Sequence, residues 1–199
     1  MALVEAKHHR VTSRCDLQRG GIDLNPTMTT PALSPAVFFD RDGVLIEDTG
    51  FPHLEKDLIL TPGAAQALRR LNDLGYRTII VTNQSGVARG LFGLDQMHAF
   101  NDLLVRTLAE QGGRIDAVYA CPYHSVGSVA EFVHPDHPDR KPNPGMILRA
   151  MTEQGIDPAG SFLIGDRQSD LDAARNAGIP GHLFSGGDLD AFVAGLLAT

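Results

Sequence analysis

The chain has 199 residues, of which 43% are hydrophobic and 21% are charged, and its formal net charge at pH 7 is −7. This composition is typical of a single globular domain, and the acidic balance argues against a nucleic-acid or anionic-membrane partner. No apolar run approaches the ~20 residues that cross a bilayer, and two cysteines, Cys15 and Cys121, provide no disulfide framework. We therefore expect a cytoplasmic protein that acts as a monomer and binds neither membranes nor nucleic acid.

Residues 1–35 show neither helical nor strand periodicity and are rich in polar residues, glycine and proline. We expect a flexible N-terminal extension here, followed by one domain over residues 36–199. Met28 is a second candidate start of translation, so residues 1–27 could come from an early start site.

From Ala36 onward, short runs rich in Val, Ile and Phe alternate with segments that have the apolar spacing of amphipathic helices. Pro62 in the first turn and Gly75 at the end indicate the bounds of one such helix. Alternating strands and helices predict an α/β fold with a parallel sheet that is covered by helices on both faces. The predicted strands cover residues 36–40, 77–83, 115–121, 161–166 and 180–184, and the predicted helices cover residues 61–76, 93–113, 143–155, 169–178 and the C-terminal segment.

Polar side chains close three of the predicted strands. Asp40 ends the first strand and is followed by Asp42, Thr82 lies at the end of the second, and Asp166 ends the fourth. Lys141 precedes a predicted helix in the segment "DRKPNPG". Because ligands collect at the carboxyl ends of parallel strands, we expect these residues to meet in one pocket.

Three acidic groups in one pocket repel one another unless a cation lies among them. Residues i and i+2 of an extended segment point the same way, ~6–7 Å apart, so Asp40 and Asp42 face one side and Asp166 joins them. Mg²⁺ prefers a few carboxylate or carbonyl oxygens together with water and phosphate. Lys141 and the Thr82 hydroxyl suit the remaining oxygens of a phosphoryl group, where charge builds in the transition state. A carboxylate held in line with phosphorus can form an acyl phosphate while its neighbour transfers protons, so the pattern indicates phosphomonoester hydrolysis.

The motifs "DRDGV", "VTNQSG", "RKPNPG" and "GDRQSD" stand in the order, and at roughly the spacing, of the four motifs of the haloacid dehalogenase-like (HAD-like) phosphatases. The chain resembles this superfamily from about Ala36 to Gly178. The segments "CPYH" and "GSVAEF" add a closer resemblance to the D-glycero-D-manno-heptose 1,7-bisphosphate 7-phosphatase and histidinol-phosphatase family. The resemblance implies a three-layer Rossmann-like fold without a large cap domain, and the segments between the motifs leave no room for one.

The resemblance also implies roles for individual residues. Asp40 would be the nucleophile and Asp42 the general acid and base, while Asp40, the backbone carbonyl of Asp42 and Asp166 would hold Mg²⁺. Thr82 and Lys141 would stabilise the phosphoryl group. The residues that it places at the substrate are Asp48, Thr49, Gly50, Phe51, Asn83, Gln84, Ser85, Arg140 and Arg167.

Several of these residues also have structural interpretations. Thr82 could satisfy backbone groups at a strand end, and Lys141 could be a surface lysine before a proline. Arg140 and Arg167 are open between substrate contact and a structural ion pair. Asp170 fits a helix cap or a support for the neighbouring acidic group better than a direct metal ligand.

The loop before the third motif departs from the family pattern. Many members hold Zn²⁺ there through a Cys-x-His pair and a Cys-x-Cys pair, but Tyr123 occupies the expected histidine position and the second pair is missing. The loop instead carries a series of one cysteine and three histidines that suits tetrahedral zinc, with Asp136 or Asp139 as a replacement for one imidazole. The alternative is a loop that has lost its metal. We expect a structural Zn²⁺ on Cys121, His124, His134 and His137.

The implied activity is hydrolysis of a small sugar phosphate in carbohydrate metabolism, with D-glycero-D-manno-heptose 1,7-bisphosphate as the expected substrate. Histidinol phosphate is an alternative substrate, because the hydrolytic motifs do not separate the two. A non-catalytic phosphate-binding protein and a nucleic-acid 3′-phosphatase are further alternatives. Every catalytic position carries a residue that can do the chemistry, which argues against a non-catalytic protein. The sequence has no basic stripe, which argues against a nucleic-acid phosphatase.

Overall fold

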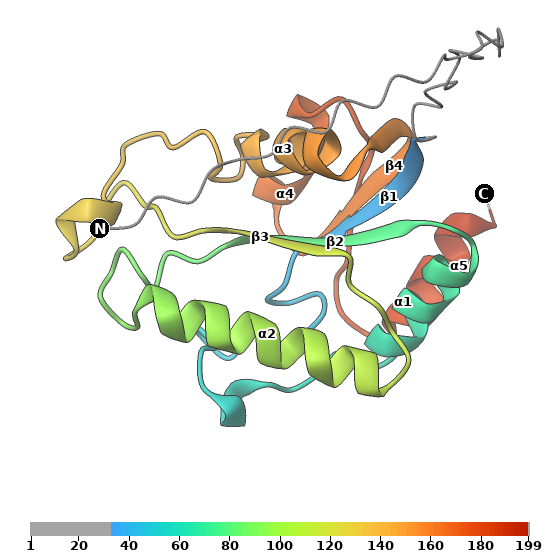
Figure 1. Cartoon of the computed structure of the whole chain (residues 1–199), viewed down its shortest axis with the longest axis horizontal. Coiled ribbons are helices and arrows are strands. Elements are labelled where there is room, and N and C mark those ends of the chain that lie inside the picture. The colour runs from blue at the N-terminus through green and yellow to red at the C-terminus, as the bar shows by residue number, and fades with distance from the viewer. Residues whose placement is uncertain (1–32, 199) are drawn as a thin grey trace, which may run out of the picture. The chain divides into compact units, whose positions relative to one another are not determined.

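The computed structural model describes residues 33–198, and their central feature is a five-stranded parallel sheet in the order β3-β2-β1-β4-β5 (Figure 1). The expected parallel α/β sheet is confirmed. The predicted N-terminal extension lies almost wholly outside the described residues, since only its last three positions are included. The strands are β1 (Ser34–Phe39), β2 (Arg77–Asn83), β3 (Ala117–Cys121), β4 (Ile156–Gly165) and β5 (Gly181–Leu183).

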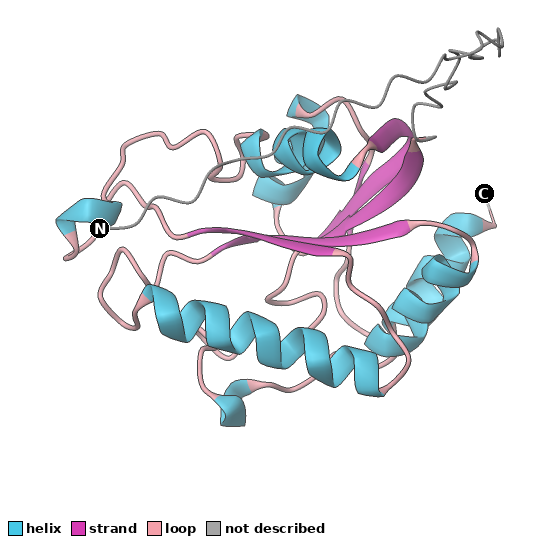
Figure 2. Cartoon of the chain, viewed as in Figure 1, coloured by secondary structure: helices cyan, strands magenta, loops and turns pink. Residues whose placement is uncertain are grey.

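Helices cover both faces of this sheet, so the described part of the chain forms three layers (Figure 2). Helices α1 (Ala64–Asp73), α2 (Leu94–Glu110) and α5 (Leu189–Leu197) lie on one face. Helices α3 (Gly145–Gln154) and α4 (Gln168–Asn176) lie on the other. Two short 3₁₀ turns, Glu55–Asp57 and Ala130–Phe132, lie in connecting loops, and no cap of domain size interrupts the described chain. None of the helices within residues 33–198 is long and apolar enough to cross a membrane.

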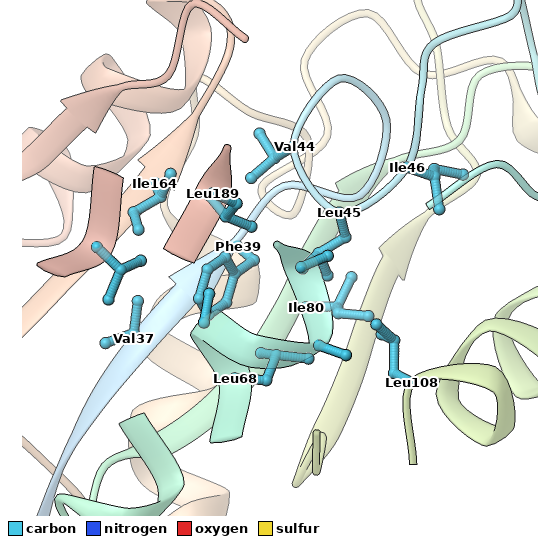
Figure 3. Packing of buried hydrophobic residues seen from close by; sticks show 14 of the residues in the cluster. Val37, Phe39, Val44, Leu45, Ile46, Leu68, Ile80, Leu108, Ile164 and Leu189 are labelled. Atoms are coloured by element: carbon cyan, nitrogen blue, oxygen red, sulfur yellow. The ribbon is translucent and has the colours of Figure 1, made fainter. Parts of the chain in front are cut away.

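The central strand shows why the sequence forms a sheet that is buried on both faces. Val37 and Phe39 pack into the core beneath α1, α2 and α5, as Figure 3 shows, whereas Ala36 and Phe38 pack against α3 and α4. All four side chains are fully buried. Because successive side chains of a strand point to opposite faces, a continuous apolar run is what such a strand requires.

The strand order determines where a ligand site can form. The chain builds β1, β2 and β3 in one direction across the sheet, then returns to place β4 and β5 on the other side of β1. Phe39 at the end of β1 therefore pairs with Ile80 of β2 and with Ile164 of β4. This reversal is the position at which open α/β sheets bind ligands, beyond the carboxyl ends of the strands.

Strand β4 begins at Ile156, five residues earlier than the sequence predicts. Its pairing with β1 shifts register on the way, since Pro35 pairs with Asp157 but Val37 pairs with Phe162. The hydroxyl of Ser161 accepts a hydrogen bond from the Ala36 backbone nitrogen at 2.8 Å within this irregular stretch. The intervening "DPAG" contains turn-forming residues that hide a strand from periodicity arguments.

Candidate active site

A cavity of about 420 Å³ opens at the carboxyl ends of β1, β2 and β4. It gathers residues from all of the segments that the sequence analysis singled out, so the predicted convergence is present. Thr49, Thr82 and Asp166 are not among its lining residues. The predicted catalytic and substrate-binding residues that do line it are Asp40, Asp42, Asp48, Gly50, Phe51, Asn83, Gln84, Ser85, Arg140, Lys141 and Arg167.

A buried carboxylate–ammonium cluster forms the floor of the cavity. The Nζ atom of Lys141 lies 3.0 Å from Asp40 Oδ1 and 2.6 Å from Asp170 Oδ1, and it donates to the Val81 carbonyl at 2.8 Å. Burial raises the pKa of Asp40 to about 7 against the opposing effect of Lys141, and Asp170 and Asp42 raise it further. Burial alone would lower the pKa of the Lys141 ammonium, but the two carboxylates outweigh it and the pKa is raised. Lys141 is therefore a buried, charged lysine and not a surface residue.

The backbone of Lys141 is fixed to the end of β2 by Asn83. The Asn83 side chain donates from Nδ2 to the Lys141 carbonyl at 3.0 Å, and its Oδ1 accepts from the Lys141 backbone nitrogen at 3.1 Å. Asp170 reaches the same ammonium from α4, where its second oxygen also accepts from the Arg167 backbone nitrogen at 3.0 Å. Asp170 thus caps α4, which is one of the two roles that the sequence suggested, and it supports Lys141, whereas the other suggested role was support for Asp166.

Three carboxylates converge beside this cluster. One oxygen from each of Asp40, Asp166 and Asp170 lies within 4.8 Å of the others. Oδ1 of Asp166 is buried without a hydrogen-bond partner among the described residues, and burial, with a smaller effect of Asp170, raises the pKa of this carboxyl. A buried oxygen without a donor calls for a cation, and an all-oxygen donor set suits Mg²⁺. The residues present therefore fit a magnesium ion.

Gly43 makes this approach of Asp166 possible. Its φ of +82° lies in the left-handed region that favours glycine, and a Cβ there would lie 2.5 Å from Asp166 Oδ2. The glycine after "DRD" therefore has a steric reason: the first loop passes directly against the carboxylate that follows β4.

The carboxylate of Asp42, the second aspartate of the first motif, is held by the side chains of Arg41 and Gln84. Asp42 Oδ1 accepts from Arg41 Nε at 2.7 Å, and its Oδ2 accepts from Arg41 NH2 and from Gln84 Nε2, both at 3.1 Å. Gln84 Nε2 also donates to the Thr82 hydroxyl at 2.9 Å. The buried Thr82 thus contacts the site through Gln84.

The outer part of the cavity is cationic. Arg167 lies 2.8 Å from Asp48 across the mouth, so these two predicted substrate contacts are paired with each other. Arg140 donates to the Tyr123 carbonyl at 3.0 Å, and burial lowers the pKa of its guanidinium. Arg89, to which the sequence assigned no chemistry, lies over the Phe51 ring at 5.8 Å and lines the cavity. Ser169 also lines it and carried no sequence signal beyond its place in the fourth motif.

The four residues predicted to bind zinc do not form a comparable cluster. His134 and His137 accept at Nδ1 from the backbone nitrogens of Asp136 and Asp139. His124 Nδ1 lies 2.7 Å from the Val126 carbonyl and 2.9 Å from the Val126 nitrogen. Cys121 Sγ lies 4.0 Å from His137 Nδ1, and the His137 ring stacks on Tyr123 at 3.9 Å. His124 instead lines the cavity near Arg89. Within residues 33–198, Asp40, Asp166 and Asp170 form the one group of three His, Cys, Asp or Glu side chains whose ligand atoms lie within 4.8 Å of one another.

Comparison with known proteins places the chain in a family. Residues 37–92 match the family described as haloacid dehalogenase-like hydrolase, and residues 139–191 match the family described as HAD-hydrolase-like. The D-glycero-beta-D-manno-heptose-1,7-bisphosphate 7-phosphatase of Rhodopseudomonas palustris is 45% identical, over 82% of this chain and 90% of its own length. The chain belongs to the heptose bisphosphate phosphatase family of the haloacid dehalogenase-like hydrolases.

Two further members of the heptose bisphosphate phosphatase family agree with this placement. The D-glycero-D-manno-heptose-1,7-bisphosphate 7-phosphatase of Thermosynechococcus vestitus is 44% identical, over 81% of this chain and 84% of its own length. The crystal structure of D,D-heptose 1,7-bisphosphate phosphatase from B. bronchiseptica, complexed with magnesium and phosphate, is 33% identical with a TM-score of 0.69. That alignment covers 82% of this chain and 98% of the other. The predicted superfamily, closer family and HAD-like fold are thereby confirmed.

Proposed function

We propose that this member of the heptose bisphosphate phosphatase family hydrolyses phosphate monoesters through an aspartyl phosphate on Asp40. The observation that carries the proposal is the position of Asp40 in the cavity, with Oδ1 held by the Arg41 backbone nitrogen at 2.7 Å and by Lys141 at 3.0 Å. These contacts fix one oxygen and leave Oδ2 as the candidate to attack phosphorus.

In the first step, Asp40 Oδ2 forms a bond to phosphorus as the bond from phosphorus to the ester oxygen breaks. Asp42 gives a proton to the departing oxygen, which leaves as an alcohol. The Lys141 ammonium lies beside the reacting carboxylate, where it stabilises the negative charge that develops on the phosphoryl oxygens. Thr82, fixed by Gln84, is assigned the same task from the end of β2.

In the second step, water replaces Asp40 on phosphorus. Asp42, now a carboxylate, takes a proton from the water as its oxygen bonds to phosphorus and the acyl phosphate bond breaks. Inorganic phosphate leaves, and the carboxylate of Asp40 and the protonated Asp42 are regenerated. The two aspartates thus divide covalent chemistry and proton transfer between them.

We assign Mg²⁺ to Asp40, the backbone carbonyl of Asp42 and Asp166. The partnerless oxygen of Asp166 and its closeness to Asp40 support this assignment. Asp170 is left out because both of its oxygens already have donors, Lys141 Nζ for Oδ1 and the Arg167 backbone nitrogen for Oδ2. When bound, the ion supplies positive charge to the carboxylates and to the phosphoryl oxygens. Zinc is not part of the proposal, because within residues 33–198 Cys121, His124, His134 and His137 do not bring their ligand atoms together.

The substrate that we propose is D-glycero-D-manno-heptose 1,7-bisphosphate, with loss of the phosphate at C7. The support comes from the names of two relatives, both heptose 1,7-bisphosphate 7-phosphatases. They are 44–45% identical to this chain over more than four-fifths of its length. A cavity lined by Arg89, Arg140 and Arg167 suits a strongly anionic sugar. We further propose that the enzyme is a cytoplasmic monomer with neither membrane nor nucleic acid as a partner.

The test is phosphate release from a panel that contains both anomers of the heptose bisphosphate, histidinol phosphate and p-nitrophenyl phosphate. We expect kcat/KM to be highest for one heptose bisphosphate anomer, with activity lost after EDTA treatment and restored by Mg²⁺ but not by buffer alone. A preference for histidinol phosphate would replace the substrate assignment. Absence of hydrolysis across the panel with Mg²⁺ present would overturn the enzymatic proposal.

Gly43→Ala is expected to lower kcat/KM by about 100-fold and to raise the Mg²⁺ concentration for half-maximal activity by about tenfold, because the methyl group displaces Asp166. A magnesium titration of initial rates measures both effects. Gly75→Ala is the matched control, since Gly75 has a similar φ of +86° but nothing within 4 Å of the position that an added methyl group would take. Equal, small effects of the two substitutions would show that Asp166 is not displaced or is not needed.

A further inference from the structure

The side chain of Arg41, between the two aspartates of the first motif, is fully buried. Its guanidinium makes five hydrogen bonds, all to oxygen atoms, and stands over the Phe100 ring at 4.8 Å. A buried charge costs free energy unless it is paired and hydrogen-bonded. Here Nε and NH1 donate one hydrogen bond each, and the two hydrogens of NH2 are shared among three oxygens. No sequence pattern indicates a role for this residue.

The contacts of Arg41 join separate parts of the fold at one carboxylate. Nε and NH2 hold the two oxygens of Asp42 at 2.7 and 3.1 Å. NH1 donates to Asn101 Oδ1 on α2 at 2.8 Å, and NH2 also donates to the Pro52 carbonyl at 3.0 Å and to Gln84 Oε1 at 2.9 Å. Arg41 therefore links Asp42 to helix α2, to the loop after β2 and to the loop that carries Asp48.

We propose that Arg41 is a positioning residue that fixes the Asp42 carboxyl group for its two proton transfers. This inference rests on the proposed function. Arg41 itself does not touch the reacting atoms; it acts through Asp42, which lines the cavity, whereas Arg41 does not.

The hydrogen-bond pattern identifies the oxygen that carries the proton. Oδ2 of Asp42 accepts from both Arg41 NH2 and Gln84 Nε2, which occupies its two lone pairs. Oδ1 accepts only from Arg41 Nε among the described residues and keeps one lone pair. The transferred proton therefore resides on Oδ1, and the forked guanidinium sets the direction of that lone pair. A lysine cannot make the same pair of hydrogen bonds to both oxygens of Asp42, because an ammonium lacks the planar pair of donors.

The test compares wild type with Arg41→Lys on two esters. The first is the best sugar phosphate of the panel, whose alkoxide leaving group needs a proton. The second is 2,4-dinitrophenyl phosphate, whose leaving group departs without one. We expect kcat on the sugar phosphate to fall about 100-fold, whereas the rate of the first dinitrophenolate release changes less than about threefold.

The second proton transfer supplies an independent readout. Because water must also be deprotonated, Arg41→Lys is expected to release dinitrophenolate in a burst and then turn over slowly, with phosphorylated protein accumulating in acid-quenched samples. A substitution that only loosens the fold would slow both esters equally and give no burst. Arg175→Lys makes the same change at an exposed arginine on α4, paired with Asp172 at 2.7 Å, and should behave as wild type.

Asn101→Ala is the second variant if Arg41→Lys does not fold. It removes the α2 anchor of the guanidinium but retains Arg41, so the same pattern is expected with a loss of about three- to tenfold on the sugar phosphate. Equal losses on the two esters, or no loss with either variant, would overturn the positioning role. Failure of wild type to hydrolyse either ester would instead reject the proposed function, so the two failures are distinct.

Discussion

Replacing Asp40 by asparagine is expected to lower kcat for phosphate release by at least about 10⁴-fold, because an amide cannot form the acyl phosphate. The variant should still fold: Asp170 remains 2.6 Å from Lys141 Nζ, so the buried ammonium keeps a counter-ion. Steady-state phosphate release and acid-quench trapping of phosphorylated protein measure the effect. Both signals should disappear in Asp40→Asn.

Asp172→Asn is the control for this change, since it converts a carboxylate to an amide on α4 beside Arg175, away from the cavity lining. Its activity should remain within about twofold of wild type, as surface substitutions generally allow. An Asp40→Asn enzyme that retains a tenth of wild-type activity, or that still forms a phosphorylated protein, contradicts the assignment of Asp40 as nucleophile.

Replacing Lys141 by methionine is expected to damage both stability and catalysis. The substitution keeps a long unbranched side chain but removes the cation that lies between Asp40 and Asp170. Breaking a buried ion pair by removing one partner costs about 3–5 kcal/mol, and losing one group that stabilises transition-state charge lowers kcat by about 10²–10³-fold. Urea unfolding in EDTA and initial rates with saturating Mg²⁺ measure the two effects separately.

The double variant Lys141→Met/Asp170→Asn distinguishes the two roles of the lysine. Removing the second carboxylate relieves part of the buried repulsion, so the free energy of unfolding should partly recover. Activity should not recover, because no cation is restored beside Asp40. Full activity in the double variant would show that Lys141 serves only as a counter-ion, and an unchanged unfolding free energy in Lys141→Met would contradict the buried pair.

Much of the fold could be predicted because its strands are apolar runs that end in polar residues. The predicted range 77–83 coincides with β2, whose "TIIV" is buried on both faces. The early part of β4 could not be found in this way. Ile156 pairs with Ser34, but the following "DPAG" forms an irregular excursion before regular pairing resumes at Phe162. Local periodicity does not report pairing that the partner strand imposes.

The site was predictable where its residues belong to motifs at the ends of predicted strands or before a predicted helix, and unpredictable where no motif identifies a residue's partners. Asp40, Asp42 and Lys141 meet in the cavity as the sequence indicated. The environment of Arg41 depends on Pro52, Gln84 and Asn101, and no pattern within "DRDG" identifies them.

The zinc site expected in residues 121–137 shows that closeness in the sequence is not enough to predict a metal site. Cys121 and three histidines are close in sequence, yet ligand atoms must also point to one centre. Within residues 33–198 the ligand atoms of these four residues do not come together, and the His137 ring stacks on Tyr123. Sequence spacing predicts proximity of residues, whereas coordination depends on side-chain direction.

Two hydrogen bonds join the Asn83 side chain to the Lys141 backbone, within the long connection between β3 and α3. They separate the part of this connection that holds Lys141 from the part that lines the cavity. They fix the Lys141 backbone to the end of β2, and its ammonium donates to the Val81 carbonyl of the same strand, so we expect the place of the ammonium to depend little on the conformation of residues 122–138. That stretch contributes His124 to the cavity rim and supplies the Tyr123 carbonyl that holds Arg140. Evolution or protein engineering can therefore rewrite this loop to recognise a different phosphorylated molecule while the hydrolytic machinery beneath it stays intact.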